Sequence, residues 1–521
     1  MQYDLVFQGG GAKGMAFVGA MAVFEQRNHT FRRLVGTSAG AINAALMAAG
    51  YNANDMAEAL NETMEDGRPV FESFMTPPSI HEIDGVELNN SLLVNAFKKM
   101  GSLIDNKIFN GADVVKWLQD ETLDNASLAI IKAILDKLGY ETLKNHAGQF
   151  YSLFELGGLF SAAKFIDWLE RKLNEKDPTF GGATLGALYK KTKVDLSLCV
   201  TDITGNKLLV LNHRTAPDLP LIWAVRMSMS IPFVWPPVTW LSTWGTYSEG
   251  THESVLTDHR IIDGGALSNF ALRLTTSAGL SVRAVMAADP DIDEAEFAQF
   301  NAQAPTVGFM LDSSLEVPGA GEAPQSVGIM ATLESAGQWL HENAPPTNMI
   351  SLFGDVLLTM MTGNDNFVLA TQEDSVCRLP VGNIGTLEFD MSPGRKAALV
   401  TAANNATEAF FKDGLEFVVN ELFMGVGDDG KFEIGCNING NPSSRDWIGL
   451  FKSPQDNQAD VANGNWLHVK PGDNLLNTIT QAELGQYEAR YYAFHSWGWF
   501  GLNSNYKLVK RTGPLNRIVA R

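Results

Sequence analysis

The opening of the chain contains the same local arrangement twice. A short apolar stretch, Tyr3–Phe7, runs directly into the glycine-rich turn Gly9–Gly14, and a second stretch, Arg32–Val35, runs into Gly36–Gly40. After each turn, apolar residues recur at the spacing of a helix. A repeated strand–turn–helix unit predicts parallel strands whose two faces are both covered by helices. We therefore expect an α/β fold built on a mostly parallel central sheet.

The rest of the chain divides into a mixed helix–strand part and a tail. A long, mainly helical insertion runs from 79 to 180, while Val282–Ala287 is typical of a strand and Ala397–Glu421 of a helix. Beyond about residue 420, short alternating segments separated by Pro, Gly and Asn indicate a small all-β sandwich. We therefore expect two domains, 1–420 and 421–521.

Composition excludes several classes of partner. The 521 residues include 39 Lys+Arg and 59 Asp+Glu, so the net charge is −20. Nucleic-acid binding needs a basic surface, so we expect no nucleic-acid partner. The three cysteines are too scattered for a disulfide framework or a zinc site and no calcium-loop pattern occurs, so we expect no metal and no other cofactor. The chain has no 18-residue apolar run and no basic leader, which predicts a cytoplasmic or peripheral membrane protein without a transmembrane helix or signal peptide.

The second glycine-rich turn carries a candidate nucleophile. Gly36-Thr37-Ser38-Ala39-Gly40 fits the pattern G-x-S-x-G between a predicted strand and a predicted helix. A nucleophile on such a sharp turn needs small residues two positions away on either side, because the chain folds back there. The following helix points its free N–H groups and its positive dipole end at Ser38, where an oxyanion would develop. The alternative is an ordinary turn of small residues.

The first glycine run is a candidate oxyanion hole. Because they lack side chains, Gly9, Gly10 and Gly11 can bring backbone N–H groups close to a tetrahedral intermediate. Gly9, Gly11 and Gly14 also satisfy the dinucleotide pattern G-x-G-x-x-G. That pattern needs an acidic residue at the end of the second strand, where neither Asp nor Glu is present. A P-loop is excluded because Lys13 is not followed by Ser or Thr, so we favour the oxyanion hole.

A serine nucleophile also needs a base. None of the nine histidines lies in a turn that singles it out. Asp263 offers an alternative, because it follows the short strand Arg260–Ile262 and precedes Gly264 and Gly265. The carboxyl end of that strand would share the sheet edge where Ser38 emerges. A carboxylate can act as a base when burial raises its pKa, although Asp-Gly-Gly could also be a simple turn.

Together these motifs resemble those of the patatin-like phospholipases, a family of lipid acyl hydrolases with a Ser–Asp dyad. The family's motif G-G-G-x-K/R-G is matched by Gly9–Gly14, its nucleophile elbow by Gly36–Gly40, and its Asp-Gly-Gly by 263–265. The resemblance covers roughly residues 1–420 and implies a three-layer α/β/α fold. Further similar stretches are Thr184–Tyr189, Val200–Asp202, Ser228–Phe233 and Gly385–Asp390, whereas Asn269-Phe270 stands where the family commonly has a proline-containing turn.

The resemblance implies hydrolysis of a fatty-acyl ester of a phospholipid or lysophospholipid. Asp263 would take the proton from Ser38 as its Oγ attacks the ester carbonyl, and amides of the first glycine run would stabilise the oxyanion. Lys13 would orient that glycine run or supply a positive charge. The alternatives are a neutral-lipid esterase or thioesterase with the same residues, and a partner-activated protein with low intrinsic activity.

Three further regions bear on access to a substrate or a partner. Apolar residues in the insertion 79–180 and in Asn348–Met361 would suit a membrane-facing lid or a buried core, and we favour the core. Asp446–Phe451 and Gly485–Tyr492 resemble parts of an SKICH-like β-sandwich, which implies a module that docks a protein or a membrane. The alternative for this domain is a structural cap. We expect an acyl-ester lipid as substrate and transient contact with a membrane surface.

Overall fold

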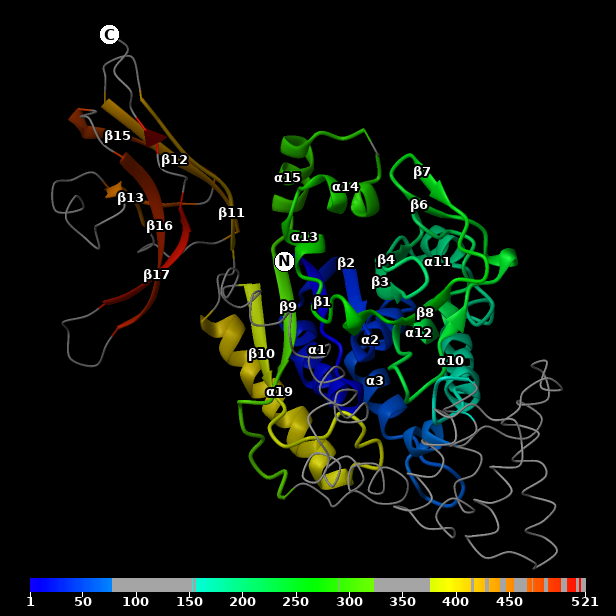
Figure 1. Ribbon diagram of the computed structural model, residues 1–521. Helices are drawn as coiled ribbons and strands as arrows, with labels where there is room; N and C mark the ends of the chain where they lie inside the picture. Colours follow the sequence, from blue (N-terminus) through cyan, green and yellow to red (C-terminus); the bar gives the residue numbers. More distant parts are fainter. Residues whose placement is uncertain are drawn as a thin grey trace, which may run out of the picture.

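The computed structural model in Figure 1 describes most of the α/β part and the strands of the tail. The described residues are 1–76, 152, 156–289, 291–322, 375–413, 417–426, 431–440, 447–453, 466–470, 472–481, 486–497, 504–511 and 515–516. Most of the predicted insertion 79–180 and all of Asn348–Met361 lie outside the described residues.

A mostly parallel sheet forms the centre of the α/β part. Its strands are β1 (Gln2–Phe7), β2 (Thr30–Thr37), β3 (Asp195–Asp202), β4 (Lys207–Asn212), β5 (Val238–Thr239), β8 (Arg260–Asp263), β9 (Thr306–Asp312) and β10 (Val376–Pro380). Their order is β10-β9-β1-β2-β3-β8-β5, with β4 also paired to β3. The five strands from β10 to β3 run parallel, whereas β4, β8 and β5 pair antiparallel with their neighbours. The expected α/β fold with a mostly parallel central sheet is confirmed.

Helices cover both faces of this sheet, because alternate residues of each buried strand point to opposite sides. In β1, Leu5 and Phe7 belong to the larger hydrophobic cluster and Val6 to the smaller one. The larger cluster includes residues of α1 (Ala16–Gln26), α2 (Ala39–Ala48), α3 (Ala53–Leu60), α10 (Ala163–Lys176), α11 (Leu185–Thr192), α12 (Leu221–Ser228) and α19 (Pro393–Asp413). The smaller cluster includes residues of α13 (Arg273–Thr276), α14 (Leu280–Met286) and α15 (Glu294–Ala302).

Short elements complete the α/β part. They are the 3₁₀ helices η1 (Gly11–Met15), η2 (Val70–Met75), η4 (Ser242–Trp244) and η5 (Gly264–Ala266), and the hairpin of β6 (Tyr247–Glu249) with β7 (His252–Ser254). None of the helices in the described ranges is long and apolar enough to cross a bilayer.

The register of β3 explains how two distant segments meet. At Cys199, β3 pairs with Val210 of β4 on one edge and with Thr37 of β2 on the other. One residue later, Val200 still pairs with β4, but its other partner is Asp263 of β8. Strands β2 and β8 therefore occupy the same edge of β3 in succession. Their carboxyl ends approach each other head-on, because β2 runs parallel and β8 antiparallel to β3.

Two predictions of secondary structure were wrong. Val282–Ala287, predicted as a strand, lies in and just after helix α14. A short apolar run does not distinguish a strand from a buried helix, and here it packs on the smaller helical layer. The predicted helix Ala397–Glu421 also extends too far, since α19 ends at Asp413 and strand β11 begins at Phe417.

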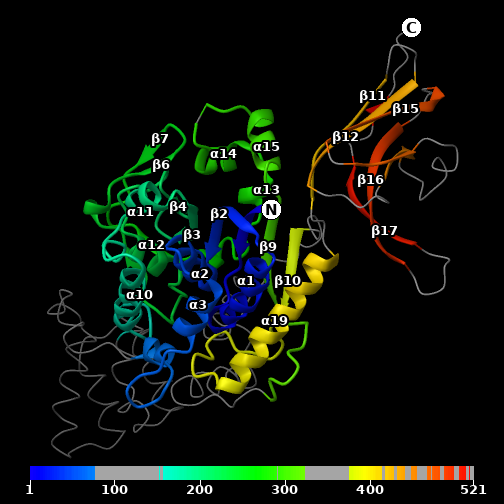
Figure 2. The same cartoon turned by 180° about the vertical axis from the view of Figure 1, so that it is seen from behind.

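The tail consists of antiparallel strands in two sheets. They are β11 (Phe417–Val426), β12 (Lys431–Gly440), β13 (Trp447–Ser453), β14 (Trp466–His468), β15 (Gly472–Gln481), β16 (Gln486–Trp497), β17 (Ser504–Arg511) and β18 (Leu515–Asn516). One sheet has the order β11-β12-β15, and the other has β14-β13-β16-β17 with β18 beside β16. Figures 1 and 2 show these strands beyond the β10 edge of the central sheet.

The described end of the predicted insertion belongs to the core. Helix α10 buries Phe165 and Trp168 completely or nearly so. Both rings pack edge-on or tilted against Phe74, and Trp168 also contacts Phe71 of η2. For these residues a packing role, rather than a membrane-facing one, is confirmed.

Candidate active site

Ser38 lies on a sharp, strained turn between β2 and α2. Its backbone has φ 53° and ψ −120°, a conformation that L-residues rarely adopt. The flanking glycines are required by space: a Cβ at Gly36 would lie 2.4 Å from the carbonyl oxygen of Gly40, and one at Gly40 would lie 2.2 Å from that of Phe7. This is the steric reason for the G-x-S-x-G pattern, and it holds Ser38 at the start of α2.

A second serine supports this turn from α12. The backbone N–H of Ser38 donates to Oγ of Ser228 at 3.0 Å, and the Ser228 hydroxyl donates to the carbonyl oxygen of Cys199 at 2.7 Å. Ser228 thus links the turn to strand β3. The sequence analysis placed Ser228 only in a stretch similar to the family, and nothing in the local pattern indicated which atom it would hold.

Asp263 is brought next to Ser38 by the pairing of β2 and β8 along β3. Its side chain is almost completely buried, and Oδ1 accepts a hydrogen bond from the N–H of Gly265 at 2.7 Å. The backbone N–H of Asp263 donates to the carbonyl oxygen of Ser230 at 3.0 Å. Its other carboxyl oxygen, Oδ2, makes no hydrogen bond of regular geometry with any described residue. The carboxyl group is therefore anchored at one oxygen and available at the other.

The electrostatic setting of Asp263 is that of a weakly acidic carboxyl group. Burial raises its pKa from 3.8 to about 7, while the N–H of Gly265 and the nearby hydroxyl of Ser38 act in the opposite direction. Desolvation dominates because the charged form has lost water and gained only these two donors. A buried carboxyl group beside a serine hydroxyl can therefore accept a proton near neutral pH.

The three predicted glycines of the oxyanion hole are held by three different segments. A Cβ at Gly9 would lie 2.2 Å from Oδ1 of Asn269, one at Gly10 2.2 Å from Cδ1 of Leu311, and one at Gly11 2.1 Å from the carbonyl oxygen of Thr386. Gly11 also has φ 57°, in the left-handed region. A side chain at Gly11 is excluded by backbone, whereas at Gly9 and Gly10 it would require the Asn269 or Leu311 side chain to move.

The N–H groups of these glycines are not equivalent. That of Gly9 donates to the carbonyl oxygen of Asn269 at 3.0 Å, so it is already engaged. Within the described residues, the N–H groups of Gly10 and Gly11 have no hydrogen-bond partner. Asn269 also donates from Nδ2 to the carbonyl oxygen of Gly9 at 3.2 Å and so joins the glycine loop to the segment after Asp263. The sequence analysis noted Asn269 only as a departure from the family.

Lys13 and Gly14 follow the loop within η1. Nζ of Lys13 donates to Oγ of Ser313 at 3.1 Å, and burial lowers the pKa of this lysine. A Cβ at Gly14 would lie 2.6 Å from Cβ of Ala39, the residue after the candidate nucleophile. Lys13 thus ties η1 to the end of β9, while Gly14 allows η1 to pack closely against α2.

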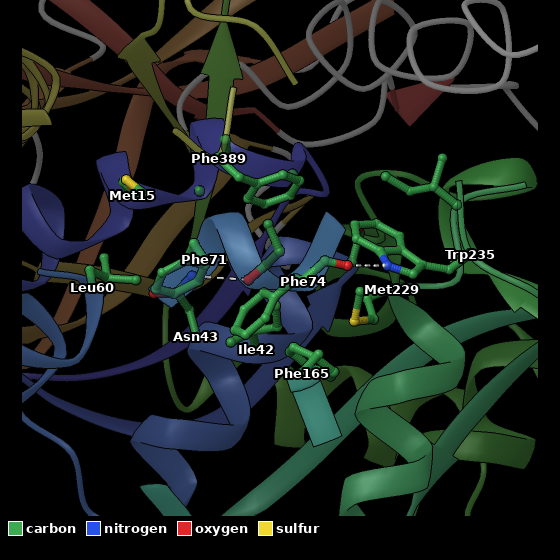
Figure 3. A pocket seen from close by; sticks show the side chains of 16 residues that line it. Met15, Ile42, Asn43, Leu60, Phe71, Phe74, Phe165, Met229, Trp235 and Phe389 are labelled. Carbon is green, nitrogen blue, oxygen red and sulfur yellow. Dashed lines mark hydrogen bonds between the residues drawn. The ribbon is translucent and has the colours of Figure 1, made fainter. Parts of the chain in front are cut away.

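An apolar pocket opens beside Ser38 (Figure 3). It encloses about 40 Å³ of free space. Its lining comes from η1, the Ser38 turn, α2, α3, η2, α10 and the segments after α12 and β10: Gly11, Ala12, Gly14, Met15, Ser38, Ala39, Ile42, Asn43, Leu60, Phe71, Phe74, Phe165, Met229, Ile231, Trp235 and Phe389. Nε1 of Trp235 donates to the carbonyl oxygen of Phe74 at 3.2 Å, which fixes one aromatic wall. Among the described residues that line it, none is charged and none is a histidine.

Among the described residues, no group of three His, Cys, Asp or Glu side chains could hold a metal ion. The site combines a strained serine, a buried carboxyl group, two backbone N–H groups without a partner in the described part of the chain, and an apolar cavity. These are the components of nucleophilic acyl transfer with oxyanion stabilisation.

Relatives and solved structures were compared with the chain. It is 25% identical over 419 residues to the uncharacterized protein YqhO of Bacillus subtilis. The aligned region covers 79% of this chain and 99% of YqhO. VipD of Legionella pneumophila matches with a TM-score of 0.35 and 16% identity, covering 78% of this chain and 66% of VipD. The type III effector ExoU matches with a TM-score of 0.30 and 14% identity, covering 79% of this chain and 53% of ExoU.

The family assignment rests on a different comparison. The family model described as patatin-like phospholipase matches residues 5–275, which include the glycine loop, the Ser38 turn and Asp263. That range is more than half of the 521 residues. The chain belongs to the patatin-like phospholipase family.

Proposed function

We propose that the protein hydrolyses fatty-acyl esters of phospholipids or lysophospholipids through an acyl-enzyme on Ser38, with Asp263 as the base. One observation carries this proposal: Asp263 is buried beside the Ser38 hydroxyl with a pKa of about 7, and its Oδ2 makes no hydrogen bond of regular geometry with the described residues. A group whose pKa lies near the working pH both accepts and returns a proton effectively. The family supports lipid acyl hydrolysis in general.

The reaction proceeds in two balanced halves. Asp263 accepts the hydroxyl proton while Oγ of Ser38 bonds to the ester carbonyl carbon, and the carbonyl electrons move to its oxygen. The intermediate collapses, the bond to the alcohol oxygen breaks, and Asp263 returns the proton to that leaving group. Water then attacks the acyl-serine by the same route, giving its proton to Asp263. Collapse of this second intermediate releases the fatty acid and restores the Ser38 hydroxyl.

Two amides are available to stabilise the negative oxygen. The N–H groups of Gly10 and Gly11 have no other partner among the described residues, whereas that of Gly9 is engaged by Asn269. The proposed oxyanion hole therefore consists of Gly10 and Gly11, with Gly9 as a support. The amino end of α2 adds a positive dipole at Ser38. Each donor contributes about a hundredfold or more to the rate.

The pocket supports an acyl chain as the group recognised. Its mainly aromatic and aliphatic lining suits a hydrocarbon, and the described lining residues include no charged side chain. The same lining and the same dyad would serve a neutral-lipid ester or a thioester, so the class of ester is decided by the assay below. Lys13 beside the glycine loop supplies a positive charge and holds the end of η1.

One observation favours a partner-activated form of the same enzyme. Free space of about 40 Å³ holds only a few water molecules, so a long acyl chain needs its aromatic walls to move. A membrane surface or a protein that docks on the C-terminal strands would supply that change. A structure of ExoU is described as a heterodimeric complex with SpcU, so partner binding is known for one structural neighbour.

The test begins with labelling by a fluorophosphonate probe, which traps a reactive serine and places an oxygen in the oxyanion hole. We expect labelling of the wild type and of a Ser242→Ala control, and none of Ser38→Ala. Labelling that survives in Ser38→Ala would refute the assignment of the nucleophile.

A panel of phospholipids, lysophospholipids, triacylglycerols and acyl-thioesters then identifies the ester, with products measured by mass spectrometry. Release of fatty acid from the phospholipids or lysophospholipids supports the proposal. Hydrolysis confined to neutral lipids or thioesters would replace it. Activity that appears only with vesicles or with a lysate fraction would favour the partner-activated form.

A further inference from the structure

The glycine loop is completed by residues beyond the family-matched range 5–275. Gly10 packs against Leu311 at the end of β9, and Gly11 packs against Thr386 in the segment between β10 and α19. The N–H of Ala12 donates to the carbonyl oxygen of Thr386 at 2.8 Å. The amides proposed to bind the oxyanion are thus aligned by a chain segment that is more than 100 residues downstream of the matched range.

The backbone of Thr386 is set by a buried ion pair. Oε2 of Glu388 accepts a hydrogen bond from the N–H of Gly385 at 2.9 Å, which closes a tight turn with Thr386 inside it. Nε of Arg395 donates to Oε1 of Glu388 at 2.6 Å, and Nη2 donates to Oε2 at 3.1 Å. Only 6% of the Glu388 side chain and 9% of the Arg395 side chain is exposed. Such a two-pronged pair fixes both the position and the orientation of the carboxylate.

The same arginine ties this turn to a second segment. Nη1 of Arg395 donates to the carbonyl oxygens of Ala320 at 2.7 Å and of Glu322 at 3.0 Å. Immediately after Glu388, Phe389 lines the pocket beside Ser38 and packs edge-on against Trp235, with ring centroids 5.9 Å apart. A shift of the turn would therefore move both the support of the oxyanion loop and one wall of the pocket.

We propose that the Glu388–Arg395 pair is a positioning element that aligns the oxyanion loop through the carbonyl oxygen of Thr386. This inference rests on the proposed function, because it concerns the rate of the same acyl transfer. Neither side chain touches the reacting atoms. A buried ion pair adds little net stability on average, so a role in geometry accounts better for its burial than a contribution to folding.

Two variants separate geometry from charge. Arg395→Lys keeps a positive charge near Glu388 but loses the planar fork and its contacts with the carbonyl groups. Glu388→Gln keeps an acceptor for the N–H of Gly385 while removing the charge. Glu408→Gln is the matched control: this residue lies on the same helix, α19, and pairs with Arg27 at 2.9 Å away from the turn.

The experiment measures kcat, KM and the rate of fluorophosphonate labelling on the full chain, together with thermal unfolding by circular dichroism. We expect Arg395→Lys to lower kcat by about ten- to a hundredfold and to slow labelling by a similar factor, as a misplaced oxyanion donor does. KM should change less than kcat. The midpoint of the acid limb of the pH profile should stay in place, since Asp263 is not altered.

The outcomes distinguish this inference from the proposed function. If Ser38→Ala is inactive but Arg395→Lys and Glu388→Gln keep wild-type kcat and labelling rates, the positioning role is wrong and the proposed function stands. If Ser38→Ala keeps its activity, the proposed function itself is wrong. If the variants unfold at a lower temperature and regain full activity when assayed below that transition, the pair only stabilises the fold and does not position the oxyanion loop.

Discussion

The pKa of Asp263 leads to a prediction that joins activity to stability. Burial raises this pKa from 3.8 to about 7. Between these two values the folded chain holds a proton that the unfolded chain has released, so the free energy of unfolding falls as the pH rises. The stabilisation is fully present below pH 3.8 and is lost as the pH approaches 7. At about 1.4 kcal/mol per unit, the whole cost of the buried charge is roughly 4 kcal/mol.

Asp263→Asn should remove this cost together with the base. The amide is neutral at every pH, and its Oδ1 can still accept the hydrogen bond from Gly265. We expect the difference in free energy of unfolding between the variant and the wild type to grow by roughly 3 kcal/mol, in favour of the variant, as the pH rises from 5 to 8. We also expect the variant to lose activity by at least about a hundredfold. In the wild type, kcat/KM should rise with pH and level off above about 7, with about a tenfold deficit at pH 6.

The assay is urea unfolding at several pH values, with kcat/KM measured over the same range. Asp291→Asn, the same substitution at an exposed position, serves as the control. A stability difference between Asp263→Asn and the wild type that does not change from pH 5 to pH 8 would refute the reasoning. So would a kcat/KM that is flat across that range.

Three further variants test other parts of the site. Gly11→Ala should abolish fluorophosphonate labelling, because its Cβ would lie 2.1 Å from the carbonyl oxygen of Thr386 and the residue has a φ of 57°. Normal labelling would show that the loop can rearrange to accept a side chain. Ser228→Ala should lower kcat by about tenfold with little change in KM, since it leaves the N–H of Ser38 without its acceptor at a cost of about 1–3 kcal/mol; an unchanged kcat would contradict this. His259→Ala should keep most of its activity in the same assay. A complete loss of activity in this variant would mean that a triad with a histidine replaces the Ser–Asp dyad.

The identity of the candidate nucleophile could be predicted because its signal is local. Gly36 and Gly40 are needed wherever a strand folds back sharply into a helix, and this demand is visible within five residues. The glycine loop is also visible locally as a run of glycines, although the backbone oxygen that excludes a Cβ at Gly11 belongs to the distant Thr386. The parallel arrangement also follows from the order of short apolar stretches and helical patterns. The clash of a Cβ at Gly36 is with Gly40, in the same turn, so this requirement leaves a pattern in the local sequence.

The meeting of Ser38 with Asp263 was predicted for an incomplete reason. The sequence analysis assumed that both strands end at the same edge of a parallel sheet. Strand β8 instead runs antiparallel to β3, and its carboxyl end meets that of β2 head-on along one edge. The direction of β8 depends on pairings with β3 between residues 59 to 63 positions apart, which no local pattern specifies.

What the sequence determined by itself is the set of residues that must be small, buried or reactive: the two glycine-rich turns, Ser38 and the Asp-Gly-Gly turn. The tertiary structure alone decided which of their groups are free. It engages the N–H of Gly9 with Asn269, gives those of Gly10 and Gly11 no partner among the described residues, and supports the loop with Thr386. Hydrogen bonds and desolvation depend on partners that are distant in sequence, so a pattern reveals the candidate atoms, whereas their partners and their pKa values follow only from the fold.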